Sequence, residues 1–550
     1  MTLNDFIAIK KCLSEKLMNY QGSVADKQEF DNAYLAIVEV LNNVKADCAV
    51  NNLNFDEVKK VPVSLDYCFD EILIEKMNRD NLTLDFKFAW SKLMNNRTAA
   101  QVDLLNGGIL KSLFYFSLPI LISYVFLQLY NTVDILIVGH FLKEESLAAI
   151  GSCIAAYELI VSFGTGFGNG LGIIVANAYG SDDDEKLKRT VAASCIISLA
   201  MIFFITVLSR LFLMKLLVLL GTPSEIIDEA YSYIIIIGVF SGVLFLYNFF
   251  ASLLRAIGNS VMPLIFLIIS SILNILFDII LITKFSMGVR GTAVATILAQ
   301  SISAVLCLLY ILKKSSILVF KPKHLGFDCE LYKSLFAQGF SMGFMVAIVS
   351  SSSLILQSAI NNLGVMIIAG HIAARKIFSI LNIPVISFGV FSATFVSQNF
   401  GAKKYERIKR GVLYSILICA VWSVLLMCTM TLFVGPAIRF LSGSENPEIL
   451  DYASKYLYFG IPFYVILGIL IVLRNSIQGL KYKVLPLISS VIELLGKILF
   501  TILIIPKIGK WGVIVCEPLI WCIMTVQLAY VYLRAMHRMT SGGNDVLHSS

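Results

Sequence analysis

The chain has 550 residues, of which 57% are hydrophobic and 15% are charged, and its mean hydropathy is +0.80. These values exceed what a soluble core needs, so the composition predicts an all-α polytopic membrane protein and excludes an ordinary soluble domain. Basic loops at a membrane surface explain the formal net charge of +7, so it gives no reason to expect nucleic acid as a partner.

The first 105 residues are denser in charge than the rest of the chain. The stretches EFDNAYLAIVEVLNNV and SLDYCFDEILIEKM have the apolar spacing of helices, with charges left for solvent. They predict a small, mostly helical extension over residues 1–105, to which the sequence assigns no role. Because no leader of the secretory type begins the chain, we expect this extension to be cytoplasmic.

Twelve apolar segments follow, each long enough to cross ~30 Å of hydrocarbon as a helix. They predict an N-lobe (106–314), an interlobe linker (315–330), a C-lobe (331–540) and a C-terminal tail (541–550). We expect the twelve helices at 109–141, 147–179, 186–214, 226–255, 260–283, 288–314, 331–360, 365–400, 404–434, 447–476, 483–506 and 510–538.

The connections between these segments differ in charge. The even-numbered ones, which include DDDEKLKR, KPKH and AKKYERIKR, carry most of the Lys and Arg, and basic loops stay on the cytoplasmic side. We therefore expect a multi-pass protein of the cell (plasma) membrane with both termini in the cytoplasm.

The chain repeats itself at an offset of 221 residues. This offset relates Gly180 to Gly401 in two similar basic connections, Gly258 to Gly479, and Gly291 to Gly512. Two six-helix lobes follow, and because six is even both enter the membrane from the same side, with a cavity expected between them. We expect a monomer that works by alternating access.

Several motifs carry a family resemblance. Five stretches carry it: LYNTVDILIVGHF, ESLAAIGSC, NAYGSDDDEKLKR, NILFDIILITKFSMGVRGTAVATILAQ and VSQNFGAKKYERIKR. The third and the last of these are counterparts in the two halves. Together they resemble the MATE (multidrug and toxic compound extrusion) family, and the match covers residues 106–540. The family belongs to a superfamily that also contains lipid and polysaccharide flippases, so the resemblance indicates the fold more firmly than the substrate.

The resemblance implies a set of site residues. In the DinF-like branch the N-lobe holds its coupling cation with residues that fall here on Asp134, Asn274, Asp278 and Thr296. Pro119 matches a proline at which the first helix of the family bends. The branch with a glutamate in the seventh helix fits less well, because VAIVSSSSLILQSAI has no carboxylate.

The residues point to the same site independently of the family. Asn274 and Asp278 are four apart, so they lie on one face of a helix, and a lone carboxylate in hydrocarbon costs roughly 3 kcal/mol or more. Hard oxygen ligands from Asp134 and Thr296 would complete a Na⁺ site, whereas two carboxylates in one dry site could instead carry a proton. The alternative is that the carboxylates only hydrogen-bond to helix backbones.

Other residues are candidates for a substrate cavity: Tyr130, Gln357, Glu493 and Glu517. Glu493 lies four residues before Lys497, a spacing that predicts a structural ion pair, with substrate contact as the alternative. Glu517 would contact a cationic substrate or cap a helix broken at Pro518. GTGFGNGLG contains the string of a dinucleotide loop, but glycines at every fourth position of an apolar helix favour close helix packing.

The function that we expect is a Na⁺- or H⁺-coupled antiporter that exports amphipathic, cationic organic compounds. A flippase of lipid-linked or anionic cargo is the alternative, and a membrane scaffold or receptor is less favoured. An enzyme is not expected, because no set of nucleophile, base and orienting group appears. We expect no cofactor, and no metal beyond Na⁺ at the coupling site, since the eleven cysteines include no Cys-x-x-Cys pair.

Overall fold

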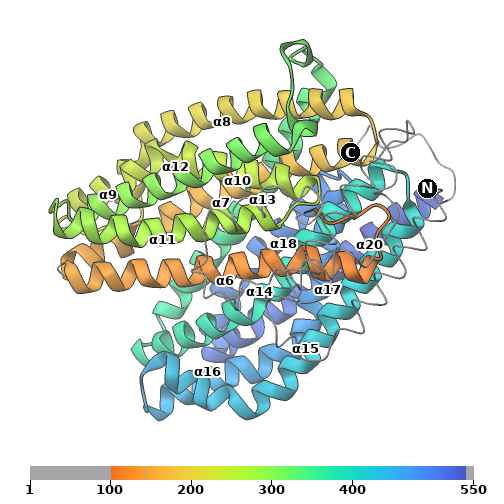
Figure 1. Ribbon diagram of the computed structural model, residues 1–550. Helices are drawn as coiled ribbons and strands as arrows, with labels where there is room; N and C mark the ends of the chain where they lie inside the picture. The colour runs from red at the N-terminus through yellow and green to blue at the C-terminus, as the bar shows by residue number, and fades with distance from the viewer. Residues whose placement is uncertain (1–100, 143, 541–550) are drawn as a thin grey trace, which may run out of the picture. The chain divides into compact units, whose positions relative to one another are not determined.

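The computed structural model describes residues 101–142 and 144–540, so the predicted extension before residue 101 and the tail at 541–550 lie outside the described residues. The described part is helical, as the sequence predicts (Figure 1). The N-lobe consists of α6 (Ile109–Phe141), α7 (Glu144–Gly180), α8 (Asp184–Leu219), α9 (Ile227–Val239), α10 (Ser241–Ala256), α11 (Val261–Thr283) and α12 (Val289–Lys314).

Two short 3₁₀ turns, η1 (Ser316–Leu318) and η2 (Pro322–His324), lie in the linker. The C-lobe consists of α13 (Cys329–Asn361), α14 (Val365–Gly401), α15 (Tyr405–Ser442), α16 (Pro447–Gly460), η3 (Ile461–Phe463), α17 (Tyr464–Gly479), α18 (Val484–Leu499), the π-turn η4 (Phe500–Ile504), α19 (Ile505–Ile508) and α20 (Lys510–Thr540).

The described residues contain eleven helices that are long and apolar enough to span a membrane, or twelve if a bent pair counts as one. The bent pair is α9 and α10, which meet at an angle of 42° and correspond to the predicted fourth span. Polar side chains begin several helices: Asp183 accepts a hydrogen bond from the Lys186 amide, and Asp328 accepts from two amides of α13. The all-α polytopic prediction is therefore confirmed.

The helices of each half form a bundle, and α6 and α13 link the two bundles (Figure 1). α6 packs against α11 of its own half and against α14 of the other. α13 does the corresponding thing, since it packs against α18 of its own half and against α7 of the other. The sequence repeat is thus visible in the structure, because the first helix of each half makes equivalent contacts with its own lobe and with the other lobe.

The glycines of GTGFGNGLG lie on two faces of α7. A Cβ on Gly168 or Gly172 would come within 3.4 or 2.9 Å of α10, and one on Gly170 would meet the backbone of α13 at 2.7 Å. The prediction of close helix packing at this string is confirmed, because larger residues would force these neighbours apart.

α7 and α14 meet where each helix ends, at a place we call the basic end, which is formed by the connections 181–183, 257–260, 315–328, 402–404 and 480–483. A Cβ on Gly180 would collide with the carbonyl oxygen of Gln398, and one on Gly401 with that of Asn177. Hydrogen bonds reinforce this contact: Ser397 donates to the Ile173 carbonyl at 2.6 Å.

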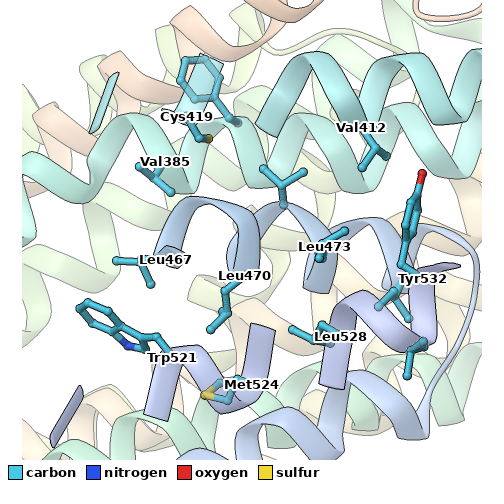
Figure 2. Close-up of a cluster of buried hydrophobic side chains, with 14 of the residues drawn as sticks. Val385, Val412, Cys419, Leu467, Leu470, Leu473, Trp521, Met524, Leu528 and Tyr532 are labelled. Carbon is cyan, nitrogen blue, oxygen red and sulfur yellow. The ribbon is translucent and has the colours of Figure 1, made fainter. Parts of the chain in front are cut away.

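The core of the C-lobe lies around α17. Figure 2 shows Leu467, Leu470 and Leu473 between side chains of α14 and α15 on one side and those of α20 on the other. All three leucines are buried, and each fully buried leucine contributes roughly 1.5–3 kcal/mol relative to exposure in water. This packing stabilises the C-lobe.

Gly180→Ala should destabilise the protein by about 1–3 kcal/mol, because its Cβ has no room against the backbone of α14. The measurement is the midpoint of thermal unfolding in detergent. Gly151→Ala is the matched control on the same helix, since a Cβ there meets nothing within 4 Å, and it should be neutral or stabilising by up to about 1 kcal/mol. Equal midpoints for the two variants would contradict the proposed contact.

Candidate functional site

Two carboxyl groups face each other between α6 and α11. Asp134 comes from α6 and Asp278 from α11, and the Asp278 side chain is 0% exposed. The two groups lie within hydrogen-bonding reach of each other, in a bond that needs one of them to carry a proton. The structure therefore brings together the two aspartates that the sequence singled out.

The two neutral residues of the predicted set lie beside them. Asn274 is one turn before Asp278 on α11, and its side-chain amide nitrogen lies 3.5 Å from the Thr296 hydroxyl of α12. Tyr130 of α6 places its hydroxyl 3.3 Å from the same Thr296 oxygen. Tyr130 was predicted for a substrate cavity, and the structure places it next to the paired carboxyl groups.

Several oxygen atoms of this cluster are buried without a hydrogen-bond donor among the described residues. They are Asp134 Oδ1, Asn274 Oδ1, and both Asp278 carboxylate oxygens. Buried acceptors normally have partners, and an uncompensated buried carboxylate is costly. The oxygens are hard ligands of the kind that alkali and alkaline-earth cations take, and a proton shared by the carboxyl groups would also satisfy them. The residues present fit either ion.

Sequence reasoning missed two further polar residues on α12. Thr292 and Gln300 stand four residues on either side of Thr296, on the same helix face, and each has a buried oxygen with no donor among the described residues. The spacing of four was the available signal. Pro119 lies within α6, which continues through it, and Ser123 donates to its carbonyl at 2.8 Å.

A network of charges lies inside the C-lobe. The Glu517 carboxylate accepts from Arg375 Nη1 at 2.8 Å and from the Tyr456 hydroxyl at 2.9 Å, and its other oxygen is 3.2 Å from Lys497 Nζ. Lys497 Nζ is also 3.1 Å from Glu493 Oε1, so the predicted pair between these two residues is confirmed. Glu493 is further approached by a buried arginine of α17, Arg474, at 3.7 Å.

This network gives Glu517 a role in ion pairs that the sequence did not reveal. α20 runs through Pro518 without a break, so Glu517 caps no helix end, and its carboxylate is already engaged by cationic side chains. The seventh predicted helix contributes Gln357, whose amide donates to Asn361 one turn later at 2.9 Å. Nothing in these contacts brings Gln357 to the paired carboxyl groups.

Glu158 is a carboxylate that sequence reasoning overlooked. It lies on α7 within a candidate membrane span, its side chain is exposed, and it is close enough to Arg375 of α14 to be affected by that charge. The rule that singled out Asp278, that an ionisable residue in a span is functional by default, applies to it equally.

Fold and site together define a class. Two six-helix bundles, a pair of facing carboxyl groups in one span pair, and charged residues buried in the other lobe are the features of a multi-pass membrane transporter.

Comparison with known proteins identifies the family. The model of the MatE family matches residues 119–280 and 342–503, one match in each half, and the chain belongs to this family. The "Probable multidrug resistance protein YoeA" of Bacillus subtilis (strain 168) is 24% identical over 396 residues, covering 71% of this chain and 85% of the relative.

Solved structures show the same fold. A MATE transporter in a bent conformation superposes with a TM-score of 0.75 at 20% identity, over 80% of this chain and 98% of the other. A multidrug resistance MATE family transporter of the MOP superfamily, in an outward-facing conformation, superposes with a TM-score of 0.74 at 20% identity, over 81% and 99%.

Glu517→Gln should destabilise the protein by about 3 kcal/mol, because it removes one of the two carboxylates that hold the buried Lys497 ammonium and leaves the half-buried Arg375 without its carboxylate. Thermal unfolding in detergent measures the change. The control is Glu445→Gln, which breaks an exposed pair with Arg439 and should cost at most about 1 kcal/mol. If the two substitutions cost the same, the network does not stabilise the lobe.

Proposed function

We propose that the chain is a secondary transporter of the DinF-like branch, which exports amphipathic organic compounds in exchange for Na⁺ or H⁺. The observation that carries this proposal is the group of buried oxygens around Asp134, Asn274, Asp278 and Thr296, which has acceptors and too few donors. A cation that enters this group satisfies it, and a cation that leaves restores the unfavourable state. Such a site can therefore couple ion flow to a conformational change.

The C-lobe supports placing the coupling site in the N-lobe. Its two buried glutamates, Glu493 and Glu517, are held by cationic side chains of the same lobe. A mobile cation would have to displace Arg375 or Lys497 to reach them, at the cost of leaving a buried charge unpaired.

The orientation follows from the charge of the loops. We propose that the basic end lies in the cytoplasm, with both termini on that side, and that the protein works as a monomer in the plasma membrane. The close contact of α7 and α14 at this end, through Gly180 and Gly401, supports a state that is closed towards the cytoplasm.

The substrate class rests on similarity and on one side chain. YoeA is named a probable multidrug resistance protein, and the outward-facing structure is of a multidrug resistance transporter. Because Glu493 and Glu517 are already paired, we propose Glu158 as the carboxylate that meets a cationic substrate: it is exposed and forms no ion pair within the described residues.

Asp278→Asn should abolish ion-driven export while leaving the protein folded. The substitution removes the charge that binds the coupling ion, so export of a fluorescent organic cation from proteoliposomes should fall at least about tenfold under the Na⁺ or the pH gradient that drives the wild type. Since the carboxylate has no donor among the described residues, the variant should unfold at the same temperature as the wild type or higher.

The control for this variant is Asp184→Asn, which removes a carboxylate of an exposed pair with Lys188 and should export normally. Continued pumping by Asp278→Asn, or a marked loss of its thermal stability, would make Asp278 structural. If the wild type moves no dye under either gradient and instead moves a fluorescent lipid across the bilayer, the flippase alternative replaces the antiporter.

Glu158→Gln should weaken binding of organic cations without uncoupling the protein. The concentration of dye that gives half-maximal export should rise about 3–10-fold, the effect expected from losing one partly solvated charge contact. The maximal rate under the driving gradient should stay close to that of the wild type. Glu145→Gln, at the start of the same helix and also exposed, is the matched control, and an equal effect of both would overturn the assignment.

A further inference from the structure

A large cavity lies at the basic end, away from the paired aspartates. Its volume is about 1110 Å³, and it lies among the end of α7, the beginnings of α8, α13 and α15, and the turn between α17 and α18. Five lysines line it: Lys186, Lys333, Lys403, Lys481 and Lys483. Glu330 is the acidic residue among those that line it.

The one carboxylate among the lining residues, Glu330, neutralises these five lysines only in part. None of the five forms an ion pair with another residue of the described ranges 101–142 and 144–540. Burial and then the charges of Lys186 and Lys483 lower the pKa of Lys481 despite the opposing charge of Glu330. Burial and the charge of Lys333 lower the pKa of Lys483. The cluster therefore carries mutual repulsion that a bound anion would relieve.

A smaller cavity of about 530 Å³ shares part of this wall and contains more carboxylates, but these are already engaged. Asp183 caps α8, Asp328 caps α13, and Glu185 is 2.6 Å from Lys323 and 3.1 Å from His324. Glu330 lines both cavities and its charge acts on Lys481, so the five lysines of the larger cavity share this one carboxylate.

The rest of the wall is apolar and continues along membrane-spanning helices. Phe340 and Phe344 line the cavity from α13, where Phe336, Phe340 and Phe344 stack at every fourth residue. Val484 and Leu487 line it from α18, whose exposed apolar face continues through Ile488, Val491 and Leu495. The cavity thus combines cationic lysine side chains with an apolar groove formed by α13 and α18.

The equivalent position in the other half of the chain is occupied, and its occupant indicates which chemistry this cavity would bind. The 221-residue offset relates Lys186 to Arg407, and the turn at Gly479 to that at Gly258. There the chain's own segment 101–107 occupies the space, with Gln101 bonded to the Ile257 carbonyl at 2.5 Å and Val102 to that of Gly258 at 2.9 Å.

The cations on that side are satisfied by the oxygens of this segment. Arg407 donates to the Leu104 carbonyl at 3.2 Å, and Lys404 donates to Asn106 at 2.7 Å and to the Leu105 carbonyl at 3.1 Å. The corresponding space beside the five lysines is the 1110 Å³ cavity. No segment among the described residues fills it with backbone or side-chain oxygens as segment 101–107 does in the other half.

We propose that this cavity binds an anionic phospholipid from the leaflet at the basic end, with the headgroup phosphate among Lys186, Lys481 and Lys483 and the acyl chains along α13 and α18. Because the cavity offers both positive charge and an apolar groove, it favours a lipid over a free anion, which would contact only the lysines. A zwitterionic lipid brings no net charge to relieve the repulsion between the lysines.

The test measures lipid retained by the purified full chain in detergent, by native mass spectrometry during titration with phosphatidylglycerol or with phosphatidylcholine. Wild type should retain phosphatidylglycerol in preference to phosphatidylcholine. The triple variant Lys186→Gln, Lys481→Gln and Lys483→Gln should bind phosphatidylglycerol about 100-fold more weakly, at about fivefold for each lysine lost.

Two matched variants keep the test decisive. Lys313→Gln, Lys409→Gln and Arg410→Gln remove three charges at the same end outside the cavity and should bind lipid as the wild type does. A second triple variant, Lys186→Arg, Lys481→Arg and Lys483→Arg, keeps the charges and should retain binding. It shows whether a loss of binding in the glutamine variant comes from the lost charge or from misfolding.

The proposal fails if the glutamine triple variant binds phosphatidylglycerol as the wild type does, or if phosphatidylcholine binds equally well. It also fails if the full chain retains no phosphatidylglycerol. Displacement of the lipid by inorganic phosphate at the same concentration would show a site for free anions instead. No ion gradient or exported compound enters the measurement, so its outcome is independent of the proposed export function.

Discussion

The contact of α7 with α14 at the basic end is the constraint on which the rest of the structure depends. Gly180 and Gly401 let the two backbones touch, and any side chain at either position would separate them. Around this contact Gln398 donates to the Ala256 carbonyl of the other lobe at 2.7 Å. Because the lobes meet here through short, buried and directional bonds, a change of angle between the lobes that opens this end must break these contacts. The helices that link the lobes, α6 and α13, must follow that change.

The two lobes share a scaffold but resolve their buried charges differently. Asn274 stands eleven residues after Pro263 on α11, and Lys497 stands eleven residues after Pro486 on α18. The C-lobe thus places an ammonium group where the N-lobe places an amide. That ammonium lies close to Glu493 and Glu517, so the positive charge that these carboxylates need is part of the protein. Under the proposed function the corresponding charge in the N-lobe comes from outside the protein, and this distinguishes the proposed coupling site from the structural network of the C-lobe.

The sequence predicted what local spacing and hydropathy determine. Twelve spans follow from the lengths of apolar runs, and the shared face of Asn274 and Asp278 follows from the helical period. It did not reveal the ion pair of Glu517, because the partner, Arg375, is 142 residues away in the chain. It did not reveal the contact of Tyr130 with Thr296 for the same reason: only the packing of α6 on its neighbours sets the Tyr130 hydroxyl beside Thr296. Contacts between helices that are distant in sequence leave no periodic signal.

α6 connects the proposed coupling site to the contact between the lobes. It carries Asp134 and Tyr130, it packs on α11, where Asp278 lies, and it also packs on α14 of the other lobe. With a cation or a shared proton in place, the carboxyl groups of α6 and α11 are held together. Without either, two negative charges repel each other across a buried gap, and the favourable response is for α6 to move away from α11. Because α6 also contacts α14, that movement would alter the packing between the lobes, and this is how ion binding is coupled to the angle between the lobes in the function that we propose.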